Sequence, residues 1–461
     1  MFRFYNSLTK RIEDFVPHEG NKVKLYTCGP TVYSFPHIGN FRSYLMEDVL
    51  ERTLRFLGYD VTRAMNITDV GHLSNDSDYG DDKMVMSAER EHKSVMDIAK
   101  YYTEVFKSDA KKLNILWPQI VVPATSCIDE YIKIISTLMD KGYAYLSNGN
   151  VYFDVSKLKE YYVLTGHNED DNLVGVREGV EFDDGKRNQA DFVLWFTKSK
   201  FADQELKWES PWGVGYPGWH IECTGISIKY LGEYLDIHCG GVDNKFPHHT
   251  NEIAQSESYL GHEWCKYWFH IEHLNGENGK MSKSEGGFTT VGNLIEKGYD
   301  PLAYRYYCLL SHYSKPLVFS FDRLDGAVVA YDKLKKTISK IERTGSIDES
   351  IYNNYLQKFK DALENNLNTS MAITVLFDVC KLDCSGATKL ELISKFDEVL
   401  ALNLLDVKTD DIPHEIKELA ALRWQAKLNK DWVNADNIRN ELLNKGYVIL
   451  DNKEGYTIEK K

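Results

Sequence analysis

Two short segments, far apart in the chain, carry side chains suited to binding a polyphosphate. In the first, His37 precedes an expected helix and is followed by Gly39 and Asn40, so that the imidazole and the helix N-terminus can both donate to phosphate oxygens. In the second, Lys280 and Lys283 lie in a glycine-flanked Lys-Met-Ser-Lys-Ser segment, and their charges suit a departing pyrophosphate. A helix-capping histidine and a basic surface loop are the separate alternatives. The two segments together predict ATP as a substrate.

A second group of residues has the chemistry of a zinc site. His248 and Glu252 are four residues apart in a helical stretch, which places them on one face of the helix. Cys28, at the end of an expected strand, and Cys223 are candidates for the remaining two ligands. Spacing alone leaves open the alternative of buried structural cysteines and a surface histidine pair, because nearly two hundred residues separate the cysteines.

The elements around these residues predict a parallel sheet. Residues 22–27 alternate as a strand, residues 41–57 have helical spacing ending at Gly58, and residues 61–67 form another strand. Strand character returns at residues 234–238, after a mixed region. Because ligands bind at the carboxyl ends of parallel strands, Cys28 and His37 are expected at a binding edge.

The fold class that follows is α/β, with a Rossmann-type catalytic domain split by an insertion, then a helix bundle and a small C-terminal mixed α/β domain. In the last domain we expect one helix, from residue 412, and a short strand-like end at residues 447–450. The expected regions are 1–115 (Rossmann, first half), 116–209 (connective insertion), 210–265 (Rossmann, second half), 266–325 (the region with the lysine loop), 326–405 (helix bundle) and 406–461 (C-terminal domain).

Composition sets the broad class. The chain has 461 residues with a net charge of −14, which disfavours non-specific coating of nucleic acid. RNA binding would then use a local basic face, such as the lysines of residues 333–343. Eight cysteines without a secretion signal favour free thiols or metal ligands, and no apolar run reaches membrane-spanning length. We therefore expect a cytoplasmic protein that does not enter membranes.

Seven segments match the signatures of a known family: Cys28 to Tyr33, His37 to Asn40, Ala64 to Asp69, Asp191 to Trp195, Gly218 to Cys223, Phe246 to His249 and Lys280 to Ser284. Over essentially the whole chain, the sequence resembles class I aminoacyl-tRNA synthetases, and among them the cysteinyl-tRNA synthetases. The resemblance implies one zinc ion held by Cys28, Cys223, His248 and Glu252. It also implies Trp219 in the substrate pocket, Thr68 close to the substrate and Asp243 as a polar contact.

That resemblance further implies the reaction and its partners. L-Cysteine and ATP, with Mg²⁺, would form cysteinyl-adenylate, and tRNA(Cys) would accept the cysteine; a monomer is expected. Zinc would favour a thiolate over the hydroxyl of serine. Two alternatives stay open: a ligase that joins cysteine to a small amine, and a non-catalytic zinc-dependent RNA-binding protein. The long helical region after Phe321 disfavours the first, and intact phosphate-binding residues disfavour the second.

Overall fold

The computed structural model describes residues 1–70, 84, 87, 90–91, 93–165, 185–198, 206–277, 279–280, 289–406, 413–451 and 455–460. The chain divides into two compact units, Met1–Leu402 and Asn403–Lys461. No helix in these ranges is long and apolar enough to cross a membrane.

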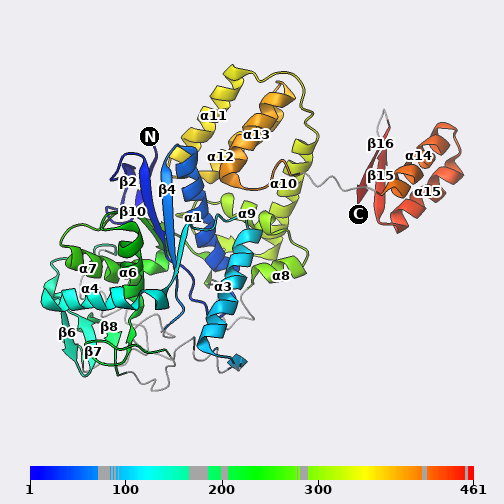
Figure 1. The fold of residues 1–461 in the computed structure, drawn as a ribbon. Coiled ribbons are helices and arrows are strands. Elements are labelled where there is room, and N and C mark those ends of the chain that lie inside the picture. The colour runs from blue at the N-terminus through cyan, green and yellow to red at the C-terminus, as the bar shows by residue number, and fades with distance from the viewer. Residues whose placement is uncertain are drawn as a thin grey trace. The chain divides into compact units, whose positions relative to one another are not determined.

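A five-stranded parallel sheet is the centre of the first unit (Figure 1). In the order β11-β10-β3-β4-β5, its strands are Cys265–Ile271, Leu235–Gly241, Lys22–Thr27, Asp60–Ile67 and Ile120–Pro123. Helix α1 (Ile38–Phe56) lies on one side of the sheet, and α6 (Trp219–Leu231) and α7 (His248–Leu260) lie on the other (Figure 1). The expected Rossmann-type sheet is therefore confirmed.

The β3-α1-β4 unit forms where the apolar spacing predicts it. Leu45, Val49 and Leu54 are fully buried along α1. The chain turns after the helix at Gly58, whose φ of 95° suits a residue without a side chain. β3 and β4 pair in parallel register from Lys22 opposite Asp60 to Thr27 opposite Met65. Both strands therefore deliver their last residues to the same edge of the sheet.

An inserted region separates β5 from β10. It contains α4 (Ile128–Asp140) and an antiparallel sheet of β6 (Ala144–Ser147), β7 (Asn150–Phe153), β8 (Phe192–Phe196) and β9 (Tyr216–Pro217). β5 pairs with β4 of the main sheet although it lies within the range expected for this insertion, 116–209, and β9, which lies beyond that range, pairs with β8. Strands of four and two residues are too short to show a period in the sequence. β11 continues in the main sheet to Ile271, which is beyond residue 265, the expected end of the second half.

The rest of the first unit is mainly helical, as expected after Phe321. Small strands β12 (Leu274–Gly276), β13 (Gly279–Lys280) and β14 (Leu317–Phe319) form one sheet, and β1 (Arg3–Asn6) pairs with β2 (Arg11–Asp14). The helices are α3 (Val95–Lys112), α8 (Val291–Glu296), α9 (Pro301–Leu309), α10 (Phe321–Ser339), α11 (Glu349–Glu364), α12 (Thr369–Lys381) and α13 (Gly386–Leu400). Phe359 of α11 and Phe396 of α13 stack with ring centroids 4.0 Å apart, which ties these helices together.

The second unit has more elements than the single helix and strand expected from its sequence. It contains α14 (His414–Leu428), α15 (Trp432–Asn444), β15 (Tyr447–Asp451) and β16 (Tyr456–Lys460). Lys430, with a φ of 61°, forms the turn between the two helices. Neither a glycine nor a proline marks that turn, so the sequence reads as one helical stretch.

Candidate functional site: a pocket with metal-ligand chemistry

A cavity of about 330 Å³ opens at the carboxyl ends of β3, β4 and β10. Its wall includes Cys28, Cys223 and His248 at one side and His37 and Asn40 at the other. The same pocket therefore joins the residues expected to bind a metal to the first segment expected to bind phosphate. This is the edge at which parallel α/β sheets bind their ligands.

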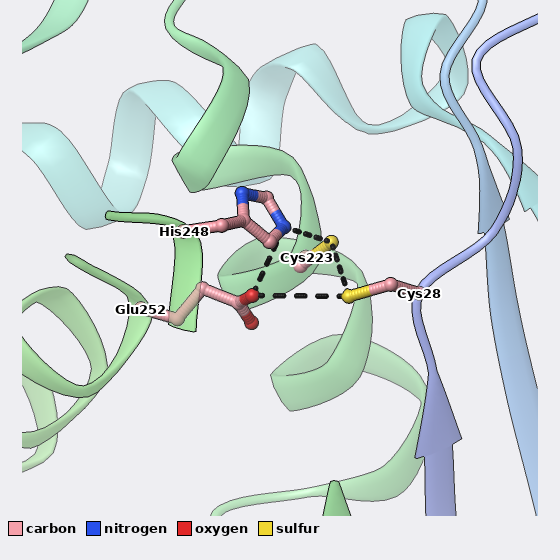
Figure 2. Close-up of side chains that lie close together, drawn as sticks. All are labelled: Cys28, Cys223, His248 and Glu252. Carbon is pink, nitrogen blue, oxygen red and sulfur yellow. Dashed lines mark hydrogen bonds and ion pairs between the residues drawn. The ribbon is translucent and has the colours of Figure 1, made fainter. Parts of the chain in front are cut away.

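Four side chains from three segments meet beside this pocket, and three of them, Cys28, Cys223 and His248, line its wall (Figure 2). Cys28 follows β3, Cys223 lies on α6, and His248 and Glu252 lie one turn apart at the start of α7. Glu252, Cys223 and His248 are at most 2% exposed. We call these four residues the donor cluster.

The distances within the donor cluster fit a tetrahedral zinc ion. For zinc–ligand bonds of about 2.0 to 2.3 Å, tetrahedral geometry requires about 3.8 Å between two sulfurs and about 3.4 to 3.6 Å for the other pairs. The sulfurs of Cys28 and Cys223 are 3.9 Å apart, and Cys223 Sγ lies 3.4 Å from His248 Nε2. Glu252 Oε1 lies 3.1 Å from His248 Nε2 and 4.0 Å from Cys28 Sγ. Each separation is within about half an ångström of the required value.

A second set of donors overlaps the first and fits less well. His238 and His249 also approach Cys28 and Glu252. However, His238 Nε2 is 2.8 Å from Glu252 Oε2, a hydrogen-bond length that leaves too little room for a shared metal ion. His249 Nδ1 is 2.8 Å from His270 Nε2, and His249 Nε2 is 3.3 Å from Cys28 Sγ. His238 instead binds Oε2 of the Glu252 carboxylate, and Oε1 faces the thiols. Residues that hydrogen-bond to metal ligands orient them in this way.

The electrostatics of the donor cluster favour a bound cation. Burial raises the pKa of both thiols, and that of Cys28 lies well above its usual range. Burial also raises the pKa of Glu252, against the lowering effect of His238, and lowers the pKa of His249 well below its usual range. The pocket therefore holds neutral thiols without a cation, and a divalent ion would displace their protons.

The first phosphate segment forms the N-terminus of α1. The backbone N–H of Asn40 donates to His37 Nδ1 at 3.2 Å, and the backbone N–H of His37 donates to Asn40 Oδ1 at 3.1 Å. His37 thus caps the helix, as the alternative interpretation held. The bond to Nδ1 places the ring proton of a neutral His37 on Nε2, so capping is compatible with donating to a phosphate. A side chain at Gly39 would lie 2.9 Å from the His37 ring, so this glycine makes room for the cap.

The second phosphate segment is described only at its edges. The backbone of Lys280 lies in β13, opposite Asn275 of β12, whereas Lys283 and the rest of the segment up to residue 288 lie outside the described residues. After them, Thr289 O accepts the backbone N–H of Ile38 at 2.9 Å, and Thr290 forms a bridge with His37. The chain that leaves the lysine segment therefore reaches the first phosphate segment directly.

Comparison with known proteins identifies the family. The family model for the class I (C) tRNA synthetase catalytic domain matches residues 14–329. Cysteine–tRNA ligase of Treponema denticola is 42% identical over 100% of this chain and 99% of its own length. The enzymes of Borrelia garinii subsp. bavariensis and Zymomonas mobilis subsp. mobilis are 41% and 39% identical, each over at least 96% of both chains.

The chain belongs to the cysteine–tRNA ligase family. Its fold is also similar to that of a solved member of another synthetase family, Mycobacterium tuberculosis methionyl-tRNA synthetase in complex with methionyl-adenylate. The TM-score is 0.54 at 12% identity, over 83% of this chain and 89% of that one. At this identity the likeness concerns the fold alone, and it agrees with the sheet and helical region described above.

The residues expected to contact a substrate of this ligase family fall at different depths. Trp219, the first residue of α6, lines the pocket and stacks on His248 with ring centroids 4.2 Å apart. Asp243 also lines the pocket, directly after β10. Thr68 lies deeper, is 1% exposed and donates to Glu222 Oε2 at 2.8 Å. The structure therefore brings Trp219 and Asp243 to the cavity wall and Thr68 behind it.

Several residues of this site were missed by the sequence analysis. His238 and His249 contact the donor cluster, and Asn66 and Glu222 lie behind it. The carboxyl end of β10 was a usable signal for His238, because residues there face the binding edge of a parallel sheet. Glu222 lies within the matched segment Gly218 to Cys223 and directly precedes Cys223, but adjacency in a helix does not place two side chains on one face.

Proposed function

We propose that this protein activates L-cysteine with ATP and Mg²⁺ and transfers it to tRNA(Cys). Membership in the cysteine–tRNA ligase family supports the reaction class. The observation that carries the choice of cysteine is the donor cluster, in which two thiols, an imidazole and a carboxylate converge in a buried pocket. A soft donor set of this kind suits zinc.

Cys28, Cys223, His248 and Glu252 would hold the zinc ion. Zinc can expand from four to five ligands, and it would accept the thiolate of cysteine as the additional ligand in preference to the hydroxyl of serine. The two amino acids are nearly the same size, so an apolar pocket alone would separate them only modestly. Trp219 and Asp243 would close the pocket around the substrate, with Thr68 behind them.

The remaining residues serve the phosphates. We propose that the cysteine carboxylate attacks the α-phosphorus of ATP in line, which forms cysteinyl-adenylate and releases pyrophosphate. His37 and Asn40 would bind the phosphates at the N-terminus of α1, beside Gly39, and Lys280 and Lys283 would stabilise the charge on pyrophosphate. The terminal ribose hydroxyl of tRNA would then attack the activated carbonyl and release AMP.

The regions after the catalytic sheet would contact tRNA. We propose a stem-contact role for residues 266–325, support from the bundle at 326–405 and anticodon binding by residues 406–461. A small amine acceptor needs no such additional surfaces. Matches that cover at least 96% of the full-length ligases in the comparison support the macromolecular acceptor. We further propose that the protein acts as a monomer in the cytoplasm.

The decisive experiment measures two reactions of the purified full chain. Cysteine should stimulate exchange between pyrophosphate and ATP, with serine far less effective, and unfractionated tRNA should become charged with cysteine. Exchange no faster with cysteine than without an amino acid would refute the proposed activity. Cysteine-dependent exchange without charging of tRNA would instead favour a small amine as acceptor.

A further inference from the structure

We propose that Glu222 is a positioning residue that keeps the sulfurs of Cys28 and Cys223 at their metal-binding separation. The inference rests on the proposed zinc site. Its basis is a chain of buried hydrogen bonds that starts next to one cysteine and ends next to the other. The two sulfurs lie 3.9 Å apart, although 195 residues separate the cysteines in the chain.

The chain of hydrogen bonds crosses the end of β4. The backbone N–H of Gly29, which follows Cys28, donates to Asn66 Oδ1 at 2.7 Å. Asn66 Nδ2 donates to Thr68 Oγ1 at 3.0 Å, and the Thr68 hydroxyl donates to Glu222 Oε2 at 2.8 Å. Glu222 directly precedes Cys223 on α6. We call Gly29, Asn66, Thr68 and Glu222 the relay.

The direction of every hydrogen bond in the relay is determined by chemistry. A backbone N–H can only donate, so Asn66 must present its oxygen to Gly29 and its NH₂ group to Thr68. Thr68 therefore accepts from Asn66, and its one proton goes to Glu222. An acceptor at position 222 is thus required to complete the relay, and a side chain without one would leave the Thr68 hydroxyl proton without an acceptor in a buried site.

Burial and close contact make the relay rigid. Asn66, Thr68 and Glu222 are at most 2% exposed, so water does not compete for their hydrogen bonds. A side chain at Gly29 would come within 1.6 Å of the Asn66 carbonyl oxygen, so the chain beside Cys28 lies directly against the end of β4. A shift of α6 would thus be transmitted through β4 to the Cys28 segment.

Glu222 has no other polar role among the residues that the structure describes. Its Oε1 lacks a hydrogen-bond partner there, so the contact with Thr68 is its one polar attachment. A fully buried carboxyl group with a single hydrogen bond costs free energy that leucine at this position would not cost. Positioning of the two cysteines provides a reason for that cost.

The test uses Co²⁺ in place of zinc in the full chain, without cysteine or ATP. Co²⁺ reports thiolate ligation through its charge-transfer band and ligand geometry through its d–d bands. Glu222→Leu and Thr68→Val, which interrupt the relay, should weaken Co²⁺ binding about 10- to 100-fold and change the d–d bands. Glu222→Gln and Thr68→Ser, which keep an acceptor and a hydroxyl respectively, should retain the wild-type spectrum and affinity.

The outcomes separate the relay from the proposed site itself. Wild-type d–d bands and affinity in both Glu222→Leu and Thr68→Val would overturn the positioning role while leaving the zinc site intact. A wild-type chain that binds Co²⁺ without thiolate bands would refute the donor cluster, and the inference with it. If Glu222→Leu does not fold, the comparison of Thr68→Val with Thr68→Ser decides, because valine and serine differ at the hydroxyl that the relay needs.

Discussion

Two buried polar clusters lie close to the same sheet and differ in how their charges are balanced. The donor cluster has thiols, an imidazole and a carboxylate, and the described residues give it no ion pair with lysine or arginine. The second, which we call the arginine cluster, joins α1 and β4 to α9. Its members are Glu47, Asp48, Glu51, Arg52, Arg63 and Arg305.

The arginine cluster contains its own counterions. Asp48 Oδ2 accepts from Arg305 Nη2 at 2.6 Å and from Arg52 Nε at 2.9 Å, and Arg63 lies between Glu47 and Glu51 at 3.4 and 3.3 Å. The chain itself supplies every charge of this cluster, so the cluster needs no ligand and has a structural role. The thiols of the donor cluster, by contrast, ionise only when an external cation supplies the countercharge. Buried polar residues thus indicate a ligand where the chain supplies no countercharge.

The largest effect is expected from breaking the arginine cluster. Asp48→Asn leaves the buried Arg305 guanidinium without its carboxylate and should lower the free energy of unfolding by about 3 to 5 kcal/mol. Urea unfolding of the full chain measures this loss. Zinc content should not change, because Asp48 does not contact the donor cluster. The exposed Asp60→Asn is the control and should change stability by less than about 0.5 kcal/mol. Equal effects of the two substitutions would contradict the structural role.

Substitutions in the donor cluster should instead reduce the zinc content. Cys223→Ser or His248→Ala should weaken zinc binding by more than about 100-fold, since loss of an outer partner alone costs 10- to 100-fold. Metal analysis after dialysis against a chelator measures the retained zinc. Cys308→Ser is the matched control, a buried cysteine on α9 outside both candidate metal sets.

The same measurement distinguishes the two overlapping donor sets. His249→Ala should retain more zinc than His248→Ala. The reverse order would favour the set that contains His238 and His249, and stoichiometric zinc in both Cys223→Ser and His248→Ala would rule out the proposed ligands.

The smallest effect concerns pH. Burial raises the pKa of Glu47 from its usual 4.5 to about 7, against the lowering effect of Arg63. Between these values the folded protein binds a proton that the unfolded chain releases, so this group makes stability fall as pH rises through the window. Glu47→Gln should therefore remove about 2 to 3 kcal/mol of that pH dependence. Unfolding from pH 4.5 to 8 checks this, with the exposed Glu19→Gln as control. If Glu47→Gln left the pH dependence of stability unchanged, other ionisable groups would be its source.

Periodicity and helical spacing could predict much of this architecture from the sequence. The apolar pattern from Leu45 to Leu54 identifies α1, and the spacing of His248 and Glu252 places both on one face of α7. The short strand β5 and the turn at Lys430 carry no such signal. The sequence therefore predicts one helix where α14 and α15 are two, and it does not predict strand β16.

The surroundings of the donor cluster were beyond sequence reasoning for a different reason. His238 reaches Glu252, and Thr68 reaches Glu222, only because β4, β10, α6 and α7 pack together. Which side chain meets which is determined by rotamers and packing across long sequence separations. The local sequence pattern does not determine those contacts.

The contacts of Arg305 have a consequence for the order of folding during synthesis. Its guanidinium donates to the carbonyl oxygens of Leu113 and Leu400 as well as to Asp48, so its partners span nearly the whole first unit. All four members of the donor cluster, by contrast, have left the ribosome once Glu252 emerges. On a chain synthesised from its N-terminus, the metal ligands are therefore available before the arginine cluster can close. The proposed zinc ion would then meet its ligands while the helical region is still being translated.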